Sequence, residues 1–180
     1  VIYSASSSCY GLPSCYPTSE TENIKLQYPY ALTKNLGEQI LLHYAKIYGL
    51  HVTSLRLFNV YGTRSRTSGT YGAMFGVFLA QKLKNKPLTV VGSGMQKRDF
   101  TYISDVIIAF YKSIKVKKNF KIYNLGTGKP ISVNRIVKLL GCKSINIPKR
   151  PGEPDQTNAN ISKIKKELNW EPKVNIEQGI

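Results

Sequence analysis

The sequence is poor in acidic side chains, in cysteine and in long apolar runs. It contains 10 Asp and Glu against 26 Lys and Arg in 180 residues, and three cysteines. Its longest apolar stretch, residues 73–80, is far shorter than the roughly 18 residues that a membrane-spanning helix needs. An odd number of cysteines without a CxxC pair argues against a disulfide framework and against a zinc site. We therefore expect no membrane partner, no metal, a reducing compartment and a cytoplasmic location.

A secretory signal is also absent, since no basic segment precedes an apolar one at the start of the sequence. The first residue is Val1, so we expect an internal fragment of a longer chain. The net charge of +16 would attract polyanions without selectivity. Lysines gather at residues 112–121 and 163–166. Because no RNP, zinc-finger or helix-turn-helix pattern accompanies them, we favour solvated faces over a nucleic-acid patch.

The periodicity of apolar residues predicts alternating strands and helices in a chain long enough to bury a sizeable core. Strands are expected at 1–4, 51–58, 88–91 and 121–125, and helices at 30–48, 74–84, 106–113, 133–140 and 162–168. We expect Gly49 to end the first helix, Ser104 or Asp105 to cap the third, and Ser132 to cap the fourth. The order of elements over residues 1–58 predicts a βαβ unit with parallel strands.

Tyr30 and Lys34 stand four residues apart at the start of the first long helix, so they share one face of it. A nearby cation favours the ionised phenol, which lowers the pKa of a tyrosine and lets it act as acid or base nearer neutral pH. The spacing alone is also typical of an ordinary amphipathic helix. Ser6, Ser7 and Ser8 precede this helix at the carboxyl end of a strand, where open α/β sheets bind ligands. Serines in a turn are more often only turn formers.

These residues belong to a longer ordered series of motifs. The series is Ser6-x-x-x-Tyr10-Gly11, Pro29-Tyr30-x-x-x-Lys34, Arg56-x-Phe58-Asn59-Val60-Tyr61-Gly62, Arg98-Asp99-Phe100, Asn124-Leu125-Gly126-x-Gly128 and Arg150-Pro151-Gly152-Glu153. Over essentially its whole length the chain resembles the extended short-chain dehydrogenase/reductase family, in its nucleotide-sugar epimerase and dehydratase branch. The resemblance implies an α/β fold, with residues 1–62 as the C-terminal part of a Rossmann-type doubly wound parallel sheet. Residues 63–180 would form mainly a smaller α/β substrate-binding domain, with segments around 98–128 returning to the Rossmann domain.

The resemblance also implies roles for individual side chains. The catalytic set would be Ser6, Tyr30 and Lys34, with Tyr30 as acid and base and Lys34 binding the nicotinamide ribose of NAD. Phe58 would lie near the nicotinamide. Substrate-binding residues would be Ser7, Ser8, Asn59, Arg98, Arg150, Glu153 and Thr157. Without the resemblance, Phe58 is expected in the core, Asn59 in a turn, and Arg98 and Arg150 on the surface.

Several of these residues would recognise the nucleotide sugar itself. Arg98 and Arg150 would grip its diphosphate, a task suited to a planar donor that is always charged. Glu153 would contact the nucleotide ribose. Thr157 would border the sugar pocket, where a small residue leaves room for the N-acetyl group of a UDP-N-acetylhexosamine. The segment 126–128 looks like a phosphate loop, but in the family it is a turn at the end of a strand, and we favour that interpretation.

One expected motif is missing, because the sequence contains no GxxGxxG to hold the pyrophosphate of NAD at a helix N-terminus. The cofactor site is therefore expected to be incomplete. Ser7 and Ser8 stand where dehydratases and decarboxylases of the family carry an additional carboxylate. The resemblance thus implies NAD-dependent epimerisation at C4 of a nucleotide-diphosphate sugar through a transient 4-keto sugar, in a homodimer when full length and with no nucleic-acid partner. A 4,6-dehydratase, a decarboxylase, a reductase, a non-catalytic sugar-nucleotide-binding fragment and a basic nucleic-acid module remain as alternatives.

Overall fold

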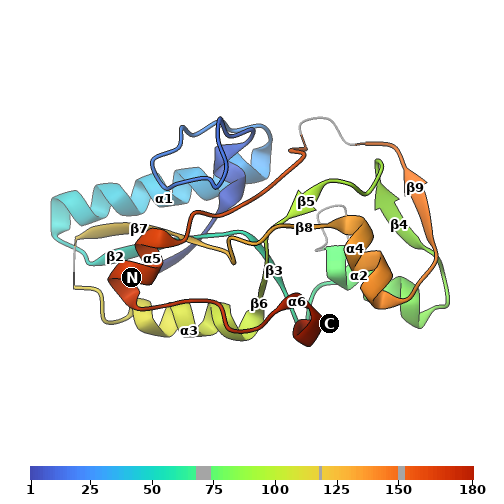
Figure 1. Cartoon of the computed structure of the whole chain (residues 1–180). Coiled ribbons are helices and arrows are strands. Elements are labelled where there is room, and N and C mark those ends of the chain that lie inside the picture. The colour runs from blue at the N-terminus through green and yellow to red at the C-terminus, as the bar shows by residue number, and fades with distance from the viewer. Residues whose placement is uncertain (68–73, 118, 150–152) are drawn as a thin grey trace.

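A computed structural model describes residues 1–67, 74–117, 119–149 and 153–180 (Figure 1). Its largest sheet has three parallel strands in the order β1-β2-β7: β1 (Ile2–Ser6), β2 (Val52–Leu57) and β7 (Phe120–Leu125). Ser6 pairs with Leu57, and Leu57 pairs with Leu125. The carboxyl ends of all three strands therefore lie at one edge of the sheet. The predicted α/β class and the predicted parallel βαβ unit are confirmed.

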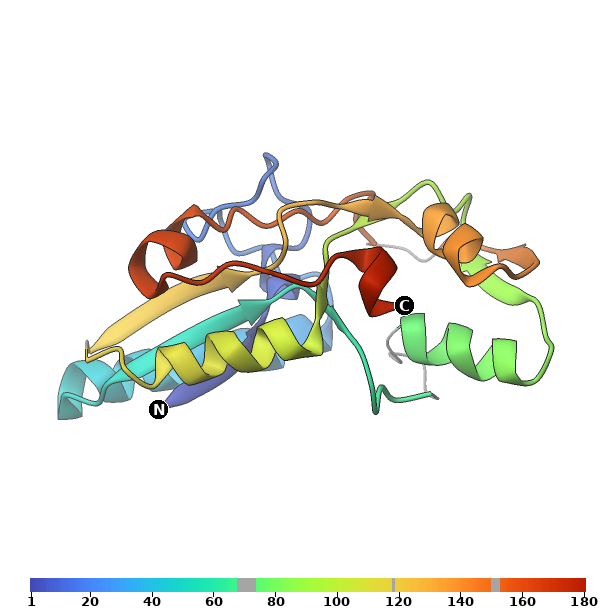
Figure 2. The ribbon, with the colours of Figure 1, turned by 60° about the horizontal axis from the view of Figure 1, so that its bottom comes forward.

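Helices cover both faces of this sheet (Figures 1 and 2). One face carries α1 (Pro29–Tyr48), and the other carries α3 (Ile103–Ser113) and α5 (Ser162–Leu168). Successive side chains of a strand point to opposite faces. Arg56 of β2 accordingly contacts α1, whereas its neighbour Leu55 packs with Val106 of α3 and Ile164 of α5. Trp170 is buried in the same core, which anchors the segment after α5.

The ends of two helices follow the sequence closely. α1 starts at Pro29, in the first turn, where the missing N–H has no intrahelical partner to lose. It ends before Gly49, whose φ of 65° is the left-handed conformation of a C-cap. Ser132 caps α4 (Val133–Leu140) by accepting the backbone N–H of Arg135 at 3.2 Å. Both predicted boundaries are confirmed.

The predicted cap of α3 at Ser104 or Asp105 is wrong. The helix begins at Ile103 and has no side-chain cap. The buried Asp105 carboxylate instead accepts the backbone N–H groups of residues 173–174, and the Asp105 carbonyl accepts the indole N–H of Trp170 at 2.9 Å. A partner that is distant in sequence has therefore displaced the local helix cap.

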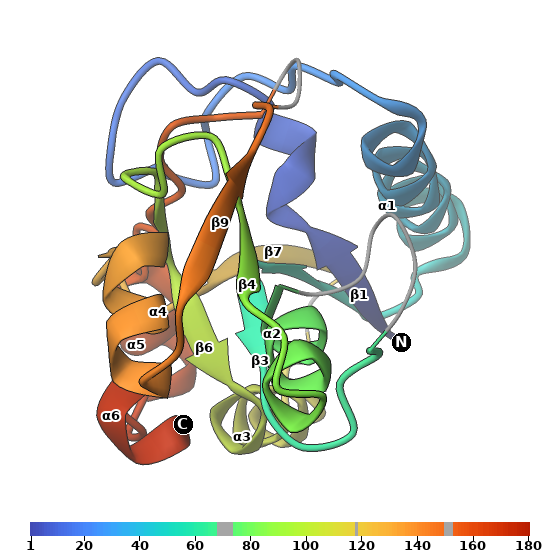
Figure 3. The same ribbon diagram turned by 90° about the vertical axis from the view of Figure 1, so that its right-hand side faces the viewer.

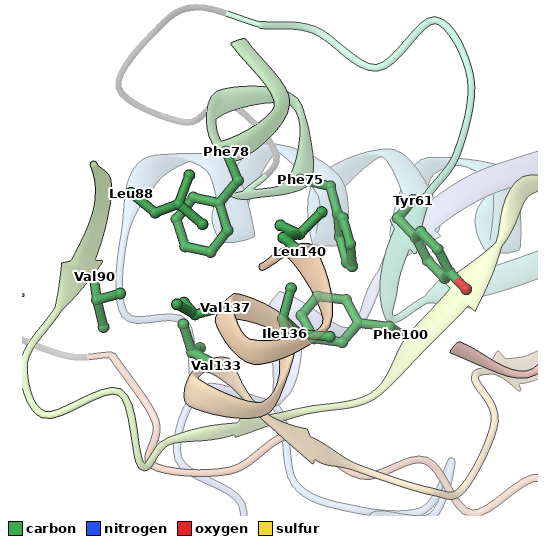
Figure 4. Packing of buried hydrophobic residues seen from close by; sticks show 10 residues of the cluster. All are labelled: Tyr61, Phe75, Phe78, Leu88, Val90, Phe100, Val133, Ile136, Val137 and Leu140. Atoms are coloured by element: carbon green, nitrogen blue, oxygen red, sulfur yellow. The ribbon is translucent and has the colours of Figure 1, made fainter. Parts of the chain in front are cut away.

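A second hydrophobic core lies beyond the carboxyl edge of the sheet (Figures 3 and 4). Phe75 and Phe78 of α2 (Met74–Leu83) pack there with Leu88 of β4 and Ile136 of α4. The strands around this core pair as β4 (Leu88–Val91) with β9 (Ser144–Ile147), β3 (Asn59–Tyr61) with β6 (Phe100–Tyr102), and β5 (Lys97–Arg98) with β8 (Ile131–Ser132). All six of these strands, and the last helix α6 (Ile176–Gly179), have four residues or fewer. Of these short elements β4 was predicted, at its observed bounds of 88–91. The others were not predicted, because so short a segment shows no period.

Two kinds of feature are not found in the described part of the chain. None of its helices combines the length and apolar character needed to cross a bilayer. None of its His, Cys, Asp and Glu side chains gather in groups of three or more that could hold a metal ion.

Candidate active site

The three serines lie at the carboxyl edge of the sheet, where β1 ends. Ser6 is the last residue of β1, and its Oγ accepts the backbone N–H of Ser8 at 3.2 Å. This contact caps the short helix η1 (Ser7–Tyr10), and we refer to residues 6–10 as the serine turn. The Ser8 hydroxyl is buried and has no hydrogen-bond partner among the described residues. Since buried polar groups are nearly always paired, this hydroxyl is available to a ligand.

Tyr30 and Lys34 stand in the first turns of α1, which packs against the serine turn. The Tyr30 side chain is exposed, and the Lys34 ammonium lies 5.9 Å from the centroid of its ring. Lys34 Nζ also donates a hydrogen bond of 2.9 Å to the carbonyl of Ser4 in β1. The strand therefore holds the ammonium beside the phenol ring.

Tyr3 fills the space between β1 and this part of α1. Its hydroxyl donates to the Lys34 carbonyl at 3.1 Å, and its ring centroid lies 5.8 Å from Lys34 Nζ. Gly37 permits this approach, since a Cβ there would lie 2.3 Å from the Tyr3 hydroxyl. Burial, with smaller contributions from Glu38 and Tyr30, raises the pKa of Tyr3. Tyr3 therefore remains a neutral packing residue.

Arg98 and Glu153 are brought together from segments that are distant in sequence. Arg98 Nη2 donates to Glu153 Oε1 at 2.9 Å, and the arginine is only 7% exposed. The expectation that Arg98 is a surface charge is therefore wrong, because its guanidinium lies inside the fold. Both side chains line a pocket of about 160 Å³ together with Lys149. Arg150, the second predicted diphosphate ligand, lies outside the described residues.

Asn59 and Thr157 also meet. The Thr157 hydroxyl donates to Asn59 Oδ1 at 3.1 Å and accepts the backbone N–H of Asp99 at 3.1 Å. Asn59 begins β3, and its backbone N–H donates to the Asp99 carbonyl at 3.0 Å. It therefore stands in a strand, and the expectation of a turn is wrong.

Asp99 is fully buried and organises the end of β7. Its carboxylate accepts the backbone N–H and the hydroxyl of Thr127, both at 2.6 Å, and the backbone N–H groups of Gly128 and Ala159, both at 2.9 Å. Gly126 is required for this packing, since a Cβ there would lie 2.5 Å from Ala159 Cβ. The N–H groups that a phosphate would need are thus occupied by a carboxylate of the chain. This confirms that residues 126–128 form a structural turn.

The predicted side chains form two groups. We use the name catalytic group for the predicted catalytic residues Ser6, Tyr30 and Lys34 together with their neighbours Ser7 and Ser8, which are predicted to bind the substrate. We use the name binding group for the predicted substrate-binding residues Asn59, Arg98, Glu153 and Thr157. Phe58 lies in the core, as expected without the resemblance, with its ring centroid 6.5 Å from that of Tyr10. Its place beside the nicotinamide stays a prediction. No hydrogen bond between described residues joins the two groups directly.

Three further residues beside the catalytic group were missed as functional candidates. Tyr10, Glu38 and Arg56 are buried and hydrogen-bonded to one another. Tyr10 and Arg56 were noticed only as members of motifs. The signal for Glu38 was its position four residues after Lys34, which places a carboxylate on the helix face that packs against the sheet.

The first lysine-rich segment, residues 112–121, lies at the opposite end of the sheet from the serine turn. Lys112, Lys115, Lys117 and Lys121 line a pocket of about 490 Å³ with Glu167, which pairs with Lys121 at 2.9 Å. The first three follow one another at the C-terminal end of α3, where cations interact favourably with the helix dipole. That these lysines form solvated faces and no nucleic-acid patch stays a prediction.

Comparison with known proteins gives a family for this arrangement. The family model described as GDP-mannose 4,6 dehydratase matches residues 1–180. A UDP-glucuronate 4-epimerase from Thermodesulfobacterium geofontis is 38% identical over 161 residues, which cover 84% of this chain and 48% of that protein. The chain spans about half the length of the curated relatives it matches.

Solved structures agree with the sequence comparison. The UDP-glucose 4-epimerase of Thermotoga maritima, solved with UDP-glucose, has a TM-score of 0.92 at 33% identity and matches 99% of this chain and 60% of its own. The UDP-glucuronic acid 4-epimerase of Bacillus cereus was solved with UDP-glucuronic acid and NAD. It has a TM-score of 0.88 at 34% identity, and the match covers 99% of this chain and 58% of that protein. The chain therefore belongs to the family described as GDP-mannose 4,6 dehydratase, among the nucleotide-sugar epimerases and dehydratases of the short-chain dehydrogenase/reductase type.

Proposed function

We propose that the full-length protein containing this chain is an NAD-dependent 4-epimerase of a UDP-sugar. The observation that carries the proposal is the exposed Tyr30 phenol beside the Lys34 ammonium, next to the serine turn. Ser7 and Ser8 supply no carboxylate for the removal of water, which favours epimerisation over dehydration. The 4-epimerases among the relatives and structural neighbours support the same function.

In this mechanism Tyr30 moves the proton of the sugar 4-hydroxyl. Tyr30 accepts that proton as general base, and the same phenol returns it to the 4-keto oxygen after the sugar has rotated. The Ser6 hydroxyl holds the C4 oxygen by a hydrogen bond. NAD would supply the hydride chemistry at C4, and Lys34 and Tyr30 are the residues that would hold its nicotinamide end.

The residues at the start of α1 fit the nicotinamide end of NAD. The Lys34 ammonium and the exposed Tyr30 phenol are suited to a ribose. The pyrophosphate end has no GxxGxxG motif within these 180 residues. Residues of the full-length protein beyond this chain must therefore hold that end.

The binding group would hold the rest of the substrate. Arg98, with Arg150, would bind the diphosphate, while Glu153 would bind the nucleotide ribose. Arg98 is already charged, buried and pointed into a pocket, which supports this role. Asn59 would hydrogen-bond the sugar, and the small Thr157 beside it leaves room for a UDP-N-acetylhexosamine.

Product analysis of the full-length protein tests this function. The protein is incubated with NAD and, separately, with UDP-glucose, UDP-glucuronate and UDP-N-acetylglucosamine, and the sugars are followed by proton NMR. We expect at least one substrate to approach an equilibrium mixture of its C4 epimers. A 4-keto-6-deoxy sugar would identify a dehydratase, a pentose from UDP-glucuronate a decarboxylase, and binding without turnover a non-catalytic protein.

We also propose that the full-length protein is a homodimer. α1 presents a stripe of exposed apolar side chains at a spacing of three or four residues, namely Leu32, Leu36, Ile40, Tyr44 and Ile47. Such a contiguous face is typical of a protein interface. Light scattering of Ile40→Lys should show a monomer, whereas Ile107→Lys on the exposed face of α3 should leave the dimer intact. A monomeric unmodified protein would contradict the proposal.

The remaining parts of the proposal concern organisation and surroundings. Residues 1–62 would belong to the NAD-binding domain, and 63–180 mainly to a substrate domain with segments around 98–128 returning to the first. The separate second core around α2 and α4 supports this division. The three free cysteines are typical of a cytoplasmic location. The protein would have no nucleic-acid partner, since the lysines at the C-terminal end of α3 can be explained by their favourable interaction with the helix dipole.

A further inference from the structure

A buried polar network joins the serine turn to α1. Arg56 in β2 donates from Nε and Nη2 to the two carboxylate oxygens of Glu38 in α1, at 3.1 and 2.5 Å. Its third nitrogen, Nη1, donates to the Tyr10 hydroxyl at 2.9 Å, and that hydroxyl donates to Asn124 Oδ1 in β7 at 2.6 Å. All four residues are at most 4% exposed. One guanidinium therefore contacts the end of the serine turn and the helix that carries Tyr30.

Stability alone is a weak reason for such a network. Removing two charges from water is costly, and buried ion pairs can often be replaced by apolar residues without loss of stability. What a planar guanidinium adds is direction, since its fork binds a carboxylate through two parallel hydrogen bonds and fixes both partners. The network is thus better suited to fixing geometry than to adding free energy of folding.

Tyr10 and Arg56 keep their charge states near neutral pH. Burial raises the pKa of Tyr10 above its ordinary value, although Arg56 acts in the opposite direction. Burial alone would lower the pKa of Arg56, but the hydrogen bonds to Glu38 and the charge interactions with Tyr10, Cys9 and Glu38 together outweigh it, and the pKa is raised. Tyr10 therefore stays protonated and Arg56 stays charged, so neither is available to exchange protons with a substrate.

The network reaches the binding group as well. Asn124 Nδ2 donates to the Thr18 carbonyl at 2.9 Å, and its backbone N–H donates to Glu20 at 2.9 Å. Thr18 forms a bridge with Ala159, two residues after Thr157. The contacts made by Arg56 and Asn124 thus connect the serine turn, α1 and the segment that carries Thr157.

We propose that Tyr10, Arg56 and Glu38 are positioning residues, which fix the Ser6 hydroxyl relative to Tyr30 and Lys34. Glu38 follows Lys34 by one helical turn, as Lys34 follows Tyr30, so the anchor lies on the same helix as both residues. Tyr10 ends the serine turn that Ser6 begins. The proposal rests on the proposed function, because it takes Ser6, Tyr30 and Lys34 as the catalytic residues.

Tyr10→Phe in the full-length protein tests the proposal, because it keeps the ring and removes both hydrogen bonds of the hydroxyl. A misplaced catalytic group can cost up to about a hundredfold in rate, so we expect kcat to fall roughly ten- to a hundredfold. KM for the UDP-sugar should change less than about twofold, as for an interaction used only in the transition state. Hydrogen exchange of the amides of residues 7–10 should become faster.

Tyr123→Phe is the matched control. Tyr123 is 1% exposed, against 2% for Tyr10, and its hydroxyl donates to Glu167 at 2.9 Å, on a different side of the sheet from α1. This variant should lower the melting temperature to a similar extent while leaving kcat and the exchange of residues 7–10 unchanged. An equal loss of kcat in both variants would show a merely structural role and overturn the proposal.

A double-mutant cycle with Ser6→Ala identifies the residue through which Tyr10 acts. If Tyr10 positions Ser6, then Tyr10→Phe should lower kcat little further in the Ser6→Ala background. Full additivity, or unchanged kcat in Tyr10→Phe alone, would overturn the proposal. Arg56→Lys, which keeps the charge and loses the fork, serves as the second variant if Tyr10→Phe does not fold.

The same experiments separate this proposal from the proposed function. If Ser6→Ala and Tyr30→Phe keep full turnover, the assignment of catalytic residues fails. The hydrogen-exchange comparison of Tyr10→Phe with Tyr123→Phe then still decides whether the network holds the serine turn. Unchanged exchange at residues 7–10 in both variants would overturn the positioning role independently of activity.

Discussion

The catalytic group and the binding group are built in opposite ways. The catalytic group comes from one continuous βα segment, and its Tyr30 phenol is exposed while the Ser8 hydroxyl has no partner among the described residues. The binding group comes from three segments around residues 59, 98 and 153–157, and its polar atoms already bind one another.

This difference predicts different responses to a ligand. The exposed Tyr30 phenol, and the Ser8 hydroxyl with no partner among the described residues, can meet a substrate without giving up a hydrogen bond within the protein. Arg98 must share or exchange its hydrogen bond with Glu153, and Thr157 its hydrogen bond with Asn59, before either binds a substrate. Since net hydrogen-bond energies are differences between exchanged partners, a change in the binding group should affect affinity moderately, whereas a change in the catalytic group should affect rate strongly.

The largest effect is expected from Tyr30→Phe in the full-length protein. This substitution removes the proton acceptor and keeps the ring, so turnover should fall by about 10² to 10⁴-fold, with the Kd of the UDP-sugar almost unchanged. Progress curves and calorimetric titration measure the two quantities. Tyr48→Phe, at the exposed far end of the same helix, should change neither. Near-normal turnover in Tyr30→Phe would show that another group transfers the proton.

A smaller effect, on stability, is expected from Asp99→Asn. The substitution weakens charge-assisted hydrogen bonds to Thr127, Gly128 and Ala159, so the free energy of unfolding should fall by about 2 to 3 kcal/mol. Urea denaturation measures the change. Asp155→Asn is the control, because that side chain is exposed and surface substitutions usually change stability by less than about 0.5 kcal/mol. Equal losses in both variants would contradict the central place of Asp99 in this turn.

The same contrast explains how much could be predicted from the sequence. The helix with Tyr30 and Lys34 was predictable because its apolar residues repeat over 20 positions and its end carries Gly49. Strands of three or four residues such as β3 and β9 have no period to detect, and they form only because distant segments supply their partners.

Polar contacts between residues distant in sequence could not be predicted from sequence patterns either. The cap predicted at Asp105 failed because residues 173–174, far along the chain, compete for its carboxylate. From the residue type alone, Arg98 was expected on the surface. No sequence pattern near Arg98 predicts its contact with Glu153, which follows 55 residues later. Local chemistry is therefore predictable where a site is continuous in sequence, as in the catalytic group, and much less so in the binding group.

Arg98→Ala should produce an effect on affinity rather than on rate. Loss of a charge-assisted contact should weaken UDP binding by about 1.5 to 3 kcal/mol, measured by calorimetry on the full-length protein. Arg135→Ala, which removes an exposed pair with Glu177, should leave UDP binding unchanged. Unaltered affinity in Arg98→Ala, or binding of oligonucleotides that UDP cannot displace and that weakens steeply with salt, would favour the basic nucleic-acid module instead.

The smallest effect is expected from Ser132→Ala, which asks whether the binding group depends on the helix behind it. Ser132 caps α4 through its hydroxyl, and its backbone pairs with Lys97 in β5, next to Arg98. Loss of an N-cap costs about 1 kcal/mol of stability, but the β5–β8 pairing uses backbone atoms only. The free energy of unfolding of Ser132→Ala should therefore fall by that amount, while its affinity for UDP stays constant. Ser144→Ala, at an exposed position, should change neither quantity. A loss of UDP affinity as large as that of Arg98→Ala would show that the cap of α4, and not the Arg98 contact alone, sets the geometry of the binding group.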